Sequence, residues 1–441
     1  TNASTINVDS KAGKSNIGMR VDKGTVATDS SGVPEAKSTG TINLSGDSSI
    51  GMISTEALAT NTGTIKTTGT TPKNLIGMAT QGGTINNTSD IKIDGESNIG
   101  MFNTSKGTTP GTATNSGNIT NSTATDKSLI GIYADSGTTT NGGTVNLKGT
   151  EVKGIVSNGS TASTSNTGTV STNGTKAVSI AALSGTVTTT GTVNIEGTSG
   201  MGLYTGKSGT STGTINANGG SINSKNGGIN VFADRGTINF NGATINTGAN
   251  SLAFIQSSNG GIVDFKSATT ANIATDGTGF YVPPASTPTT VTYTPFAGIG
   301  SISGFNNLSN LTLNMYKGSN VAVASYAESN LSSLVGSSIT GLNIVDKTGT
   351  HEYNDYLLYK SKLTADAGTT YAQFKGIALS NSSIINDTTL STSDNNVNLM
   401  AQENTDTLDW VNLVNNKTIE LKGTNSLAMY ASNGKIKNSA G

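Results

Sequence analysis

The sequence contains no cysteine, a single histidine and few charged residues. Without thiols, neither a disulfide framework nor a thiolate metal site can form. The net charge is −1, and we find no basic cluster or aromatic-plus-arginine groove, so nucleic acid is excluded as a partner. There is no apolar run near ~20 residues, so we expect no membrane-spanning helix. The chain opens at Thr1 without an apolar signal segment, and we expect it to be a mature or excised fragment.

What the sequence has in abundance is glycine and small polar residues. Glycine accounts for 57 of the 441 residues, and threonine, serine and asparagine fill most polar positions. Charged residues make up 12%, against roughly a quarter in ordinary globular chains. Threonine, serine and asparagine lose freedom in helices or compete for backbone hydrogen bonds, and glycine adds an entropy cost. This mixture favours turns and short strands.

A motif of the type I-G-M recurs along the chain. Successive copies are 33, 26, 23, 31, 23, 25, 23, 28 and 23 residues apart, so the spacing has a floor of 23. A minimum spacing that recurs, with some longer spacings, is typical of a solenoid with one coil length and occasional loop insertions. The first positions of the copies are Ile17, Ile50, Ile76, Ile99, Ile130, Lys153, Val178, Met201, Ile229 and Leu252.

One clear copy, Gly185 to Gly206, shows the internal structure of a coil. Three short runs with alternating apolar residues are separated by glycines, and in the last run Met201 alternates with Leu203 through Gly202. We therefore predict an all-β right-handed parallel β-helix, a β-solenoid with about 23 residues per coil and loop insertions. At ~4.8 Å per coil the chain gives roughly 18 coils and about 85 Å. Leucine-rich repeats and trimeric adhesin heads fit less well, because their sequence frames and periods differ.

Residues 44 to 52, LSGDSSIGM, contain a Gly-Asp-Ser run of the kind that presents a nucleophilic serine in some hydrolases. Equivalent runs end at Ser97 and Ser199 in other copies, so we interpret Ser48 as part of a repeating corner. A triad would also have to recruit His351 from about a dozen coils away. We expect Leu44 to point inward, the corner to span residues 46 to 49, and Ile50 and Met52 to rejoin the core.

Other motifs give no stronger chemical signal. The run GMGLYTGKS, residues 200 to 208, has five residues between its glycines where a phosphate-binding loop needs four. Asp90 and Asp94 alternate with isoleucines and so face outward, which makes them the best candidates for acid–base chemistry on a sugar. A solvated face explains them equally simply. The sequence favours no metal site, cofactor or catalytic residue, and we expect a protein that is not an enzyme.

The repeat loosens after Leu252. Four of the seven prolines lie in the stretch 282–295, which we interpret as a protruding loop. Weaker copies of the motif begin at Val321 and Val397, and a clear copy begins at Leu427. We therefore divide the chain into a regular β-helix at 1–278, an interrupted, aromatic-rich β-helix at 279–396, and a resumed, truncated β-helix at 397–441.

The repeats at Gly40 to Met52 resemble those in passenger domains of type V (classical, monomeric) autotransporters, specifically the very large fusobacterial-type outer-membrane adhesins. The likeness covers most of residues 1–278 and 397–441. It implies a secreted passenger at the bacterial cell surface, held to the outer membrane only through a translocator barrel that this chain does not contain. It also implies partners such as a host cell-surface receptor or glycan, or surface proteins of other bacteria.

Three functions remain open. The leading hypothesis is an adhesin segment that mediates attachment to host cells or coaggregation through the aromatic-rich interruption. The others are a structural spacer and, less favoured, a polysaccharide lyase or hydrolase. Tyrosine and tryptophan suit recognition of proteins or sugar rings, although they also fill cores. The candidate ligand-binding residues are Tyr281, Tyr293, Tyr353, Tyr356, Tyr359 and Trp410.

Overall fold

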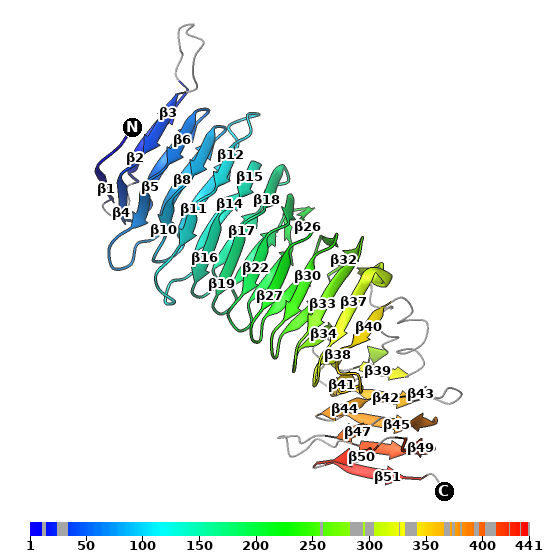
Figure 1. Ribbon diagram of the computed structural model, residues 1–441. Helices are drawn as coiled ribbons and strands as arrows, with labels where there is room; N and C mark the ends of the chain where they lie inside the picture. Colours follow the sequence, from blue (N-terminus) through cyan, green and yellow to red (C-terminus); the bar gives the residue numbers. More distant parts are fainter. Residues whose placement is uncertain are drawn as a thin grey trace. The chain divides into compact units, whose positions relative to one another are not determined.

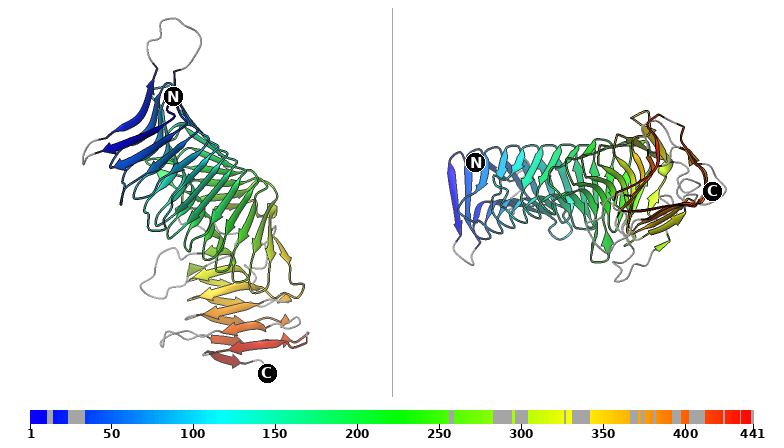
Figure 2. Two further views of the ribbon diagram at one scale, coloured as in Figure 1. Left: turned by 60° about the vertical axis from the view of Figure 1, so that its left-hand side comes forward. Right: turned by 90° about the horizontal axis from the view of Figure 1, so that it is seen from below.

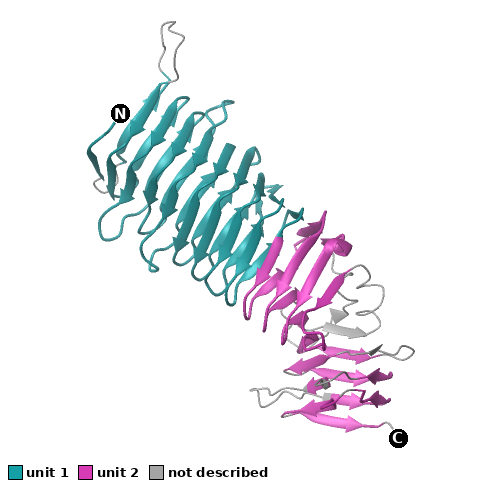
Figure 3. Cartoon of the chain, viewed as in Figure 1, with its two compact units in different colours: residues 1–243 teal, residues 244–441 magenta. Residues whose placement is uncertain are grey.

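The computed structural model describes most of the chain and consists almost wholly of short strands (Figure 1). It forms two compact units, residues 1–243 and 244–441 (Figure 3). No helix in the described part of the chain is long and apolar enough to cross a membrane. The described residues are 1–10, 15–23, 34–255, 259–282, 294–295, 304–325, 327–330, 342–365, 371–372, 375–379, 382–391, 397–401, 412–422, 424–432 and 434–439.

Unit 1 consists of nine coils in its described residues, each with one strand in each of three parallel sheets. The strands stack side by side in both views of Figure 2. The first sheet contains β1 (Thr5–Ser10), β4 (Thr41–Gly46), β7 (Thr64–Thr67), β10 (Asp90–Lys92), β13 (Asn118–Thr120), β16 (Thr144–Lys148), β19 (Thr169–Asn173), β22 (Thr192–Ile195) and β27 (Ser221–Ser224).

The other two sheets follow in the same coil order. The second sheet contains β2 (Ile17–Asp22), β5 (Ile50–Thr55), β8 (Ile76–Gln81), β11 (Ile99–Thr104), β14 (Ile130–Ala134), β17 (Lys153–Ser157), β20 (Val178–Ala182), β23 (Met201–Thr205) and β28 (Ile229–Ala233). The third contains β3 (Glu35–Ser38), β6 (Leu58–Asn61), β9 (Thr84–Asn87), β12 (Thr112–Asn115), β15 (Gly137–Asn141), β18 (Ala162–Asn166), β21 (Thr186–Thr189), β26 (Thr214–Ala217) and β29 (Thr237–Phe240). A hairpin of β24 (Lys207–Ser208) and β25 (Ser211–Thr212) projects from one coil.

The register of the second sheet confirms the β-solenoid and its repeat. Ile17 pairs with Ile50, Ile50 with Ile76, and so on through each anchor to Ile229. From Ile17 to Ile229 the chain advances 212 residues in eight steps, so a coil averages about 26 residues. The shortest coils have the expected 23 residues, as between Ile76 and Ile99. Insertions at the corners account for the longer ones.

The interior of unit 1 is made of stacked columns of like residues. Ile42, Ile65 and Ile91 lie above one another on the first sheet, and Met52, Met78 and Met101 on the second, each at most 1% exposed. Such burial contributes roughly 1.5–3 kcal/mol per large apolar side chain. Because every coil repeats the pattern, the core runs the length of the unit.

A line of buried asparagines closes the corner after the third sheet. The side-chain amide of Asn61 donates to Asn87 at 2.8 Å, Asn87 to Asn115 at 2.8 Å, Asn115 to Asn141 at 2.7 Å, and Asn141 to Asn166 at 2.7 Å. All five side chains are fully buried. Asn87, Asn115 and Asn141 each accept from one neighbour and donate to the other, which satisfies polar groups that would otherwise cost stability. The line therefore holds coil to coil in one register.

The corner before the second sheet behaves as expected from its sequence. Gly46 has φ 77° and Ser48 has φ 61°, and Leu44 is 1% exposed. The backbone N–H of Ser48 donates to the carbonyl of Lys73 in the next coil, at 3.1 Å. Ser48 is thus a left-handed corner residue. Its counterparts in other coils of unit 1 are Asn74, Ser97, Ser128, Glu151, Lys176 and Ser199, with φ between 54° and 60°.

The expectation that Ile50 and Met52 share the core is wrong for Ile50. Met52 is fully buried, but Ile50 is half-buried on the outer side of the sheet. The cause is Gly51, which also faces inward: a Cβ there would lie 2.6 Å from the carbonyl oxygen of Gly77 and 3.0 Å from the Ile65 side chain. The strand bends at this glycine, which breaks the two-residue alternation. Met201 and Leu203 show the same division, with Met201 outside.

Unit 2 begins with coils of the same kind and then changes its path. Its longest sheet contains β31 (Leu252–Ile255), β34 (Thr278–Val282), β38 (Asn320–Ser325), β41 (Asn354–Tyr359), β44 (Gly376–Leu379), β47 (Val397–Ala401) and β50 (Leu427–Ala431). A second contains β30 (Thr244–Thr247), β33 (Thr269–Ile273), β37 (Leu311–Met315) and β40 (Asn343–Asp346), and β32 (Ile262–Phe265) pairs with β36 (Phe305–Asn306). A short 3-10 helix, η2 (Leu308–Asn310), precedes β37.

Two new sheets then replace the two shorter ones. The first contains β35 (Thr294–Pro295), β39 (Ala327–Asn330), β42 (Lys362–Ala365), β45 (Ser383–Asn386), β48 (Asn412–Asn415) and β51 (Lys435–Asn438), and the second contains β43 (Tyr371–Ala372), β46 (Leu390–Ser391) and β49 (Ile419–Glu420). The longest sheet continues through the change. Val397 pairs with Leu427 as expected, whereas the partner of Thr278 is Asn320, one residue before the expected Val321. The domain boundaries at 278 and 396 stay predictions.

Candidate functional site

The three outer faces of unit 1 differ in chemistry. On the first sheet the outward side chains are threonine, asparagine, serine and charged residues, as in Thr41 and Asn43. The third sheet is the same apart from Leu58. The second sheet instead carries two outward columns of mainly apolar side chains. Of these, Ile53, Ala79, Val156, Val178 and Ala181 are buried by their neighbours, and most of the others are half-buried. We call these two columns the apolar face.

The first column consists of the first residue of each copy of the I-G-M motif. The second column consists of the residue three positions later in each strand. Both are defined by the strand register. The first column is Ile17, Ile50, Ile76, Ile99, Ile130, Lys153, Val178, Met201 and Ile229. The second column is Arg20, Ile53, Ala79, Phe102, Tyr133, Val156, Ala181, Tyr204 and Phe232.

Aromatic rings stand on this face in pairs. Phe102 and Tyr133 are stacked at a centroid distance of 5.6 Å, and Tyr204 and Phe232 are tilted at 5.7 Å. All four side chains are half-buried. In the stacked pair one face of each ring lies against its neighbour. Between the pairs lie the shorter Val156 and Ala181, both 2% exposed.

One edge of the apolar face is a polar rim. The Tyr133 hydroxyl accepts a 2.6 Å hydrogen bond from the Asn158 amide, and the Thr104 hydroxyl donates to Asp135 at 2.9 Å. Burial raises the pKa of the Tyr204 hydroxyl, with a smaller contribution in the same direction from the negative charge of Asp234. The rim thus provides a hydrogen-bond partner for the Tyr133 hydroxyl and borders a face whose side chains are mainly apolar.

The opposite edge is the corner that contains Ser48. Here Asp47, Lys73, Glu96 and Lys127 stack in successive coils, and Lys73 forms an ion pair with Glu96 at 2.7 Å. A hydrogen bond from Lys73, followed by its charge, holds the pKa of Glu96 below its usual range. Both partners are about half exposed, so the pair stabilises the fold little. The corner thus joins successive coils through backbone hydrogen bonds and stacked side chains.

The carboxylates of Asp90 and Asp94 lie on the polar face of the first sheet. Asp90 accepts a 3.0 Å hydrogen bond from Asn118, and Asp94 accepts hydrogen bonds from the backbone N–H and the hydroxyl of Ser122 in the next coil. Both groups thus join coils. This use favours the reading of a solvated structural face over acid–base chemistry.

The candidate aromatic residues that the structure describes in unit 2 do not gather in one place. Tyr281 is half-buried, between Ile255 and Val323 on the outer side of the longest sheet. Tyr359 is 39% exposed and lies 5.5 Å from the Lys360 ammonium. Tyr353 and Tyr356 are 7% and 2% exposed, so their rings belong to the interior and cannot stack on a ligand. Tyr293 and Trp410 lie outside the described residues.

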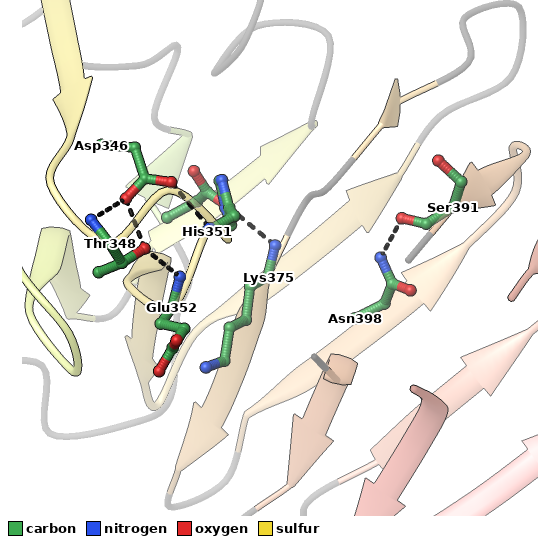
Figure 4. Close-up of polar contacts among 8 residues, drawn as sticks. Asp346, Thr348, His351, Glu352, Lys375, Ser391 and Asn398 are labelled. Atoms are coloured by element: carbon green, nitrogen blue, oxygen red, sulfur yellow. Dashed lines mark hydrogen bonds and ion pairs between the residues drawn. The ribbon is translucent and has the colours of Figure 1, made fainter. Parts of the chain in front are cut away.

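His351 lies in a compact polar loop at a corner of unit 2 (Figure 4). Its Nε2 is 2.8 Å from a carboxylate oxygen of Asp355, and its ring lies 4.2 Å from that of Tyr353. Asp346 accepts hydrogen bonds from the backbone N–H groups of Thr348, at 2.7 Å, and His351, at 2.8 Å. Partial burial opposes ionisation of Asp346, but the hydrogen bonds from Thr348, His351 and Gly349 together lower its pKa.

The same loop is tied to neighbouring coils. Lys375 donates its backbone N–H to Asp355 at 2.8 Å, and burial lowers the pKa of its ammonium. Lys317 pairs with Glu352 at 2.6 Å, which lowers the pKa of that carboxyl. The acidic groups are thus occupied by lysines, threonines and backbone amides. Among the described residues, no three His, Asp or Glu side chains are arranged to hold a metal ion.

The apolar face is the site that sequence reasoning missed. The anchor column was assigned to the core, so the outward direction of residues such as Phe102 and Tyr133 was not recognised. The signal was present in the sequence, because an apolar or aromatic residue follows the I-G-M motif in several copies, as in IGMF and IGIY. The prediction that the motif faces the core left these residues unrecognised as surface residues.

Comparison with known proteins gives one match. Residues 1–154 match the family described as BigA third pectate lyase-like domain, which covers about a third of the chain. The matched part runs from the first coil to the start of β17, and so includes Phe102 and Tyr133. No curated protein and no solved structure matches the chain. The match and the stacked coils agree with a β-solenoid passenger domain.

Proposed function

We propose that this chain is a surface-exposed adhesin segment that attaches to a protein partner through the apolar face of unit 1. The observation that carries the proposal is the difference between the outer faces, of which the second sheet alone presents apolar columns in the described part of the unit. These outward side chains lie on the far side of the sheet from the stacked interior columns, where Ile130, Tyr133 and Tyr204 pack over a small buried cluster. Half-buried apolar and aromatic side chains on an outer face, bordered by polar residues, are typical of an interaction surface.

The orientation of the rings favours protein over sugar as the partner. A sugar binds an aromatic residue by lying on its ring face, whereas Phe102 and Tyr133 hold one face of each ring against the other, and Tyr133 also packs against the buried cluster that contains Val156. Edges and aliphatic side chains make a flat apolar surface of the kind that packs against another protein. We therefore place attachment on unit 1, and not on the buried tyrosines of unit 2.

The match to an adhesin-like family with a pectate lyase-like β-helix supports a place at the cell surface. We propose further that the chain is part of an autotransporter passenger at the outer membrane, as its repeats suggest. Its targets include host cells or other bacteria. We also propose that it is not an enzyme, because Asp94 already binds Ser122. The purified chain should release no unsaturated or reducing sugars from pectate.

The test is binding of the labelled 441-residue chain to host epithelial cells and to other bacteria. Tyr133→Lys places a charge in the centre of the apolar face, and we expect it to reduce cell binding by about tenfold or more, because the charge must lose its water on contact. Thr140→Lys is the matched control. It introduces the same residue in the same coil, but on the polar face of β15.

The control should bind within about twofold of the unmodified chain. Equal loss in both variants would show that added charge, and not the apolar face, decides binding. Full binding by Tyr133→Lys with an unchanged melting temperature would rule out this face as the site of attachment.

A further inference from the structure

One asparagine–glycine pair of unit 1 is exposed and unrestrained, whereas the same dipeptide elsewhere in the unit is held by the fold. We propose that Asn173 is a site of spontaneous deamidation, in which the chain supplies the nucleophile and water is the other reactant. The product carries an aspartate or an isoaspartate at the end of β19. This modification is independent of any partner that the chain binds.

The reaction needs only the asparagine side chain, the next backbone nitrogen and water. The nitrogen of Gly174, after losing its proton, attacks the side-chain carbonyl carbon of Asn173, and the new C–N bond closes a succinimide ring. The bond from that carbon to the side-chain nitrogen breaks, and this nitrogen leaves as ammonia. Water then adds to either carbonyl of the ring and opens it, and the backbone nitrogen regains a proton. Glycine favours the attack because it has no Cβ in the way.

Both reacting groups are unrestrained at this position. Asn173 is exposed on the outer face of the first sheet, and Gly174 is half-buried. Among the described residues, none forms a hydrogen bond with the Asn173 side chain or with the backbone N–H of Gly174. The strand is held instead through the main-chain carbonyl of Asn173, which accepts from the backbone N–H of Gly149 at 2.8 Å. The nucleophile and the reacting carbonyl therefore break no hydrogen bond before they meet.

Asn141 is an internal control, because it lies in the same tripeptide, TNG. Its side chain is fully buried in the asparagine line, where it accepts from Asn115 and donates to Asn166, each at 2.7 Å. The backbone N–H of Gly142 is also held, by the Asn115 carbonyl at 2.8 Å. The same chemistry at Asn141 would have to break these buried hydrogen bonds first.

Other asparagines that precede a glycine in unit 1 have side-chain partners. The Asn158 amide donates to the Tyr133 hydroxyl at 2.6 Å, and Asn241 donates to Asn218 at 2.6 Å. Asn226 also has a partner of its own. Among the described asparagine–glycine pairs of this unit, the one at Asn173 is therefore the least restrained.

The two products differ in their effect on the fold. Asn173 pairs with Lys148 of the neighbouring strand β16 (Figure 1), and strands in a sheet lie about 4.8 Å apart. An aspartate here meets an opposite charge and fits the sheet. An isoaspartate adds a methylene group to the main chain and displaces the carbonyl that accepts from Gly149. This second product loosens the contact between two coils.

The first experiment ages the folded 441-residue chain in mildly alkaline buffer, which favours the deprotonated backbone nitrogen. Peptide mass spectrometry follows each asparagine, and chromatography separates the aspartate and isoaspartate peptides. Asn173 should react at least about tenfold faster than Asn141, because Asn141 must first give up its buried hydrogen bonds. Equal rates at the two positions, or a faster reaction at Asn141, would overturn the proposal.

The same measurement in concentrated urea separates the effect of the fold from that of the local sequence. In the unfolded chain the two TNG sites should react within about twofold of each other. Circular dichroism checks that the chain is folded in the first experiment and unfolded in the second. If Asn173 kept its full advantage in urea, the neighbouring sequence and not the structure would decide the rate, and the proposal would be wrong.

A third measurement tests the consequence of the isoaspartate. Asn173→Asp introduces the carboxylate without changing the main chain, and should melt at the temperature of the fresh unmodified chain. Ageing should lower the melting temperature of the unmodified chain more than that of Asn173→Gln, because glutamine closes the corresponding ring far more slowly. Equal losses in the two aged chains would contradict a loosened contact at this position.

Discussion

At the scale of single residues, the buried asparagine line shows how strongly one side chain can be constrained. Asn115 accepts from Asn87 at 2.8 Å and donates to Asn141 at 2.7 Å, with no exposed surface. Removing it breaks these two hydrogen bonds and a third, to the Gly117 carbonyl at 3.3 Å, and takes one partner from each neighbouring amide in an interior that water does not reach. The cost exceeds that of the bonds alone, because unpaired buried groups carry a desolvation penalty.

We therefore expect Asn115→Ala to lower the free energy of unfolding by about 2–4 kcal/mol, as measured by urea denaturation. Asn118→Ala is the control, because that amide makes one exposed bond, to Asp90 at 3.0 Å. Its loss should cost less than about 1 kcal/mol. Comparable losses of unfolding free energy in the two variants would mean that the buried asparagine bonds stabilise the fold no more than an exposed one.

At the scale of the strand, the glycine of the I-G-M motif decides which side chains are inside. Gly77 has no room for a Cβ, which would lie 2.6 Å from the Gly100 carbonyl and 2.8 Å from the Ile91 side chain. In two coils of unit 1 another residue stands in place of this glycine. Ser179 and Asn230 point inward there and form buried hydrogen bonds, for example from Asn230 to the Ile222 carbonyl at 2.9 Å. The bend therefore recurs in coils that have another residue at this position, and glycine fits it with no side chain to accommodate.

Gly77→Ala should destabilise the chain by about 1–3 kcal/mol, because the added methyl group forces adjacent coils apart. Gly142→Ala is a matched control. A Cβ at Gly142 meets nothing closer than 3.7 Å, and its backbone lies outside the left-handed region. We expect that control to be neutral or slightly stabilising in the same thermal unfolding experiment.

This bend also explains what could be predicted from the sequence and what could not. The coil period, the register of Ile17 to Ile229 and the corner at Ser48 follow from local rules of spacing and turn chemistry, and the structure confirms them. The direction of Ile50 depends on how close two backbones approach at Gly51, which alternation alone does not encode. The apolar face was therefore hidden, and the burial of Tyr353 and Tyr356 depends in the same way on packing that alternation does not encode.

At the scale of the molecule, each coil of unit 1 contacts mainly its two neighbours. The register joins Ile130 to Lys153 and Lys153 to Val178, so whole coils are interchangeable units. Stability in such arrays is close to a sum of coil and interface contributions. The folded state should then accept the loss of a complete coil but not of part of one.

Deletion of residues 153–177 removes one coil and brings Ile130 beside Val178, and we expect it to keep the β-sheet circular dichroism spectrum and cooperative unfolding. Deletion of residues 153–164 removes about half a coil and moves apolar side chains to the polar face. That variant should aggregate or unfold. Unfolding of both deletions alike would show that the coils of unit 1 are not independent units.

The direction of the hydrogen bonds between coils has a mechanical consequence for unit 1. These bonds lie along the direction in which the coils stack, so a pull applied to the two chain ends of the unit loads the outermost coil first. Coils should then peel away singly, each releasing about 26 residues, or about 90 Å of extended chain at ~3.5 Å per residue. A tethered molecule built in this way would lengthen in steps at modest force. It would thereby dissipate a transient pulling force before its bound end dissociated.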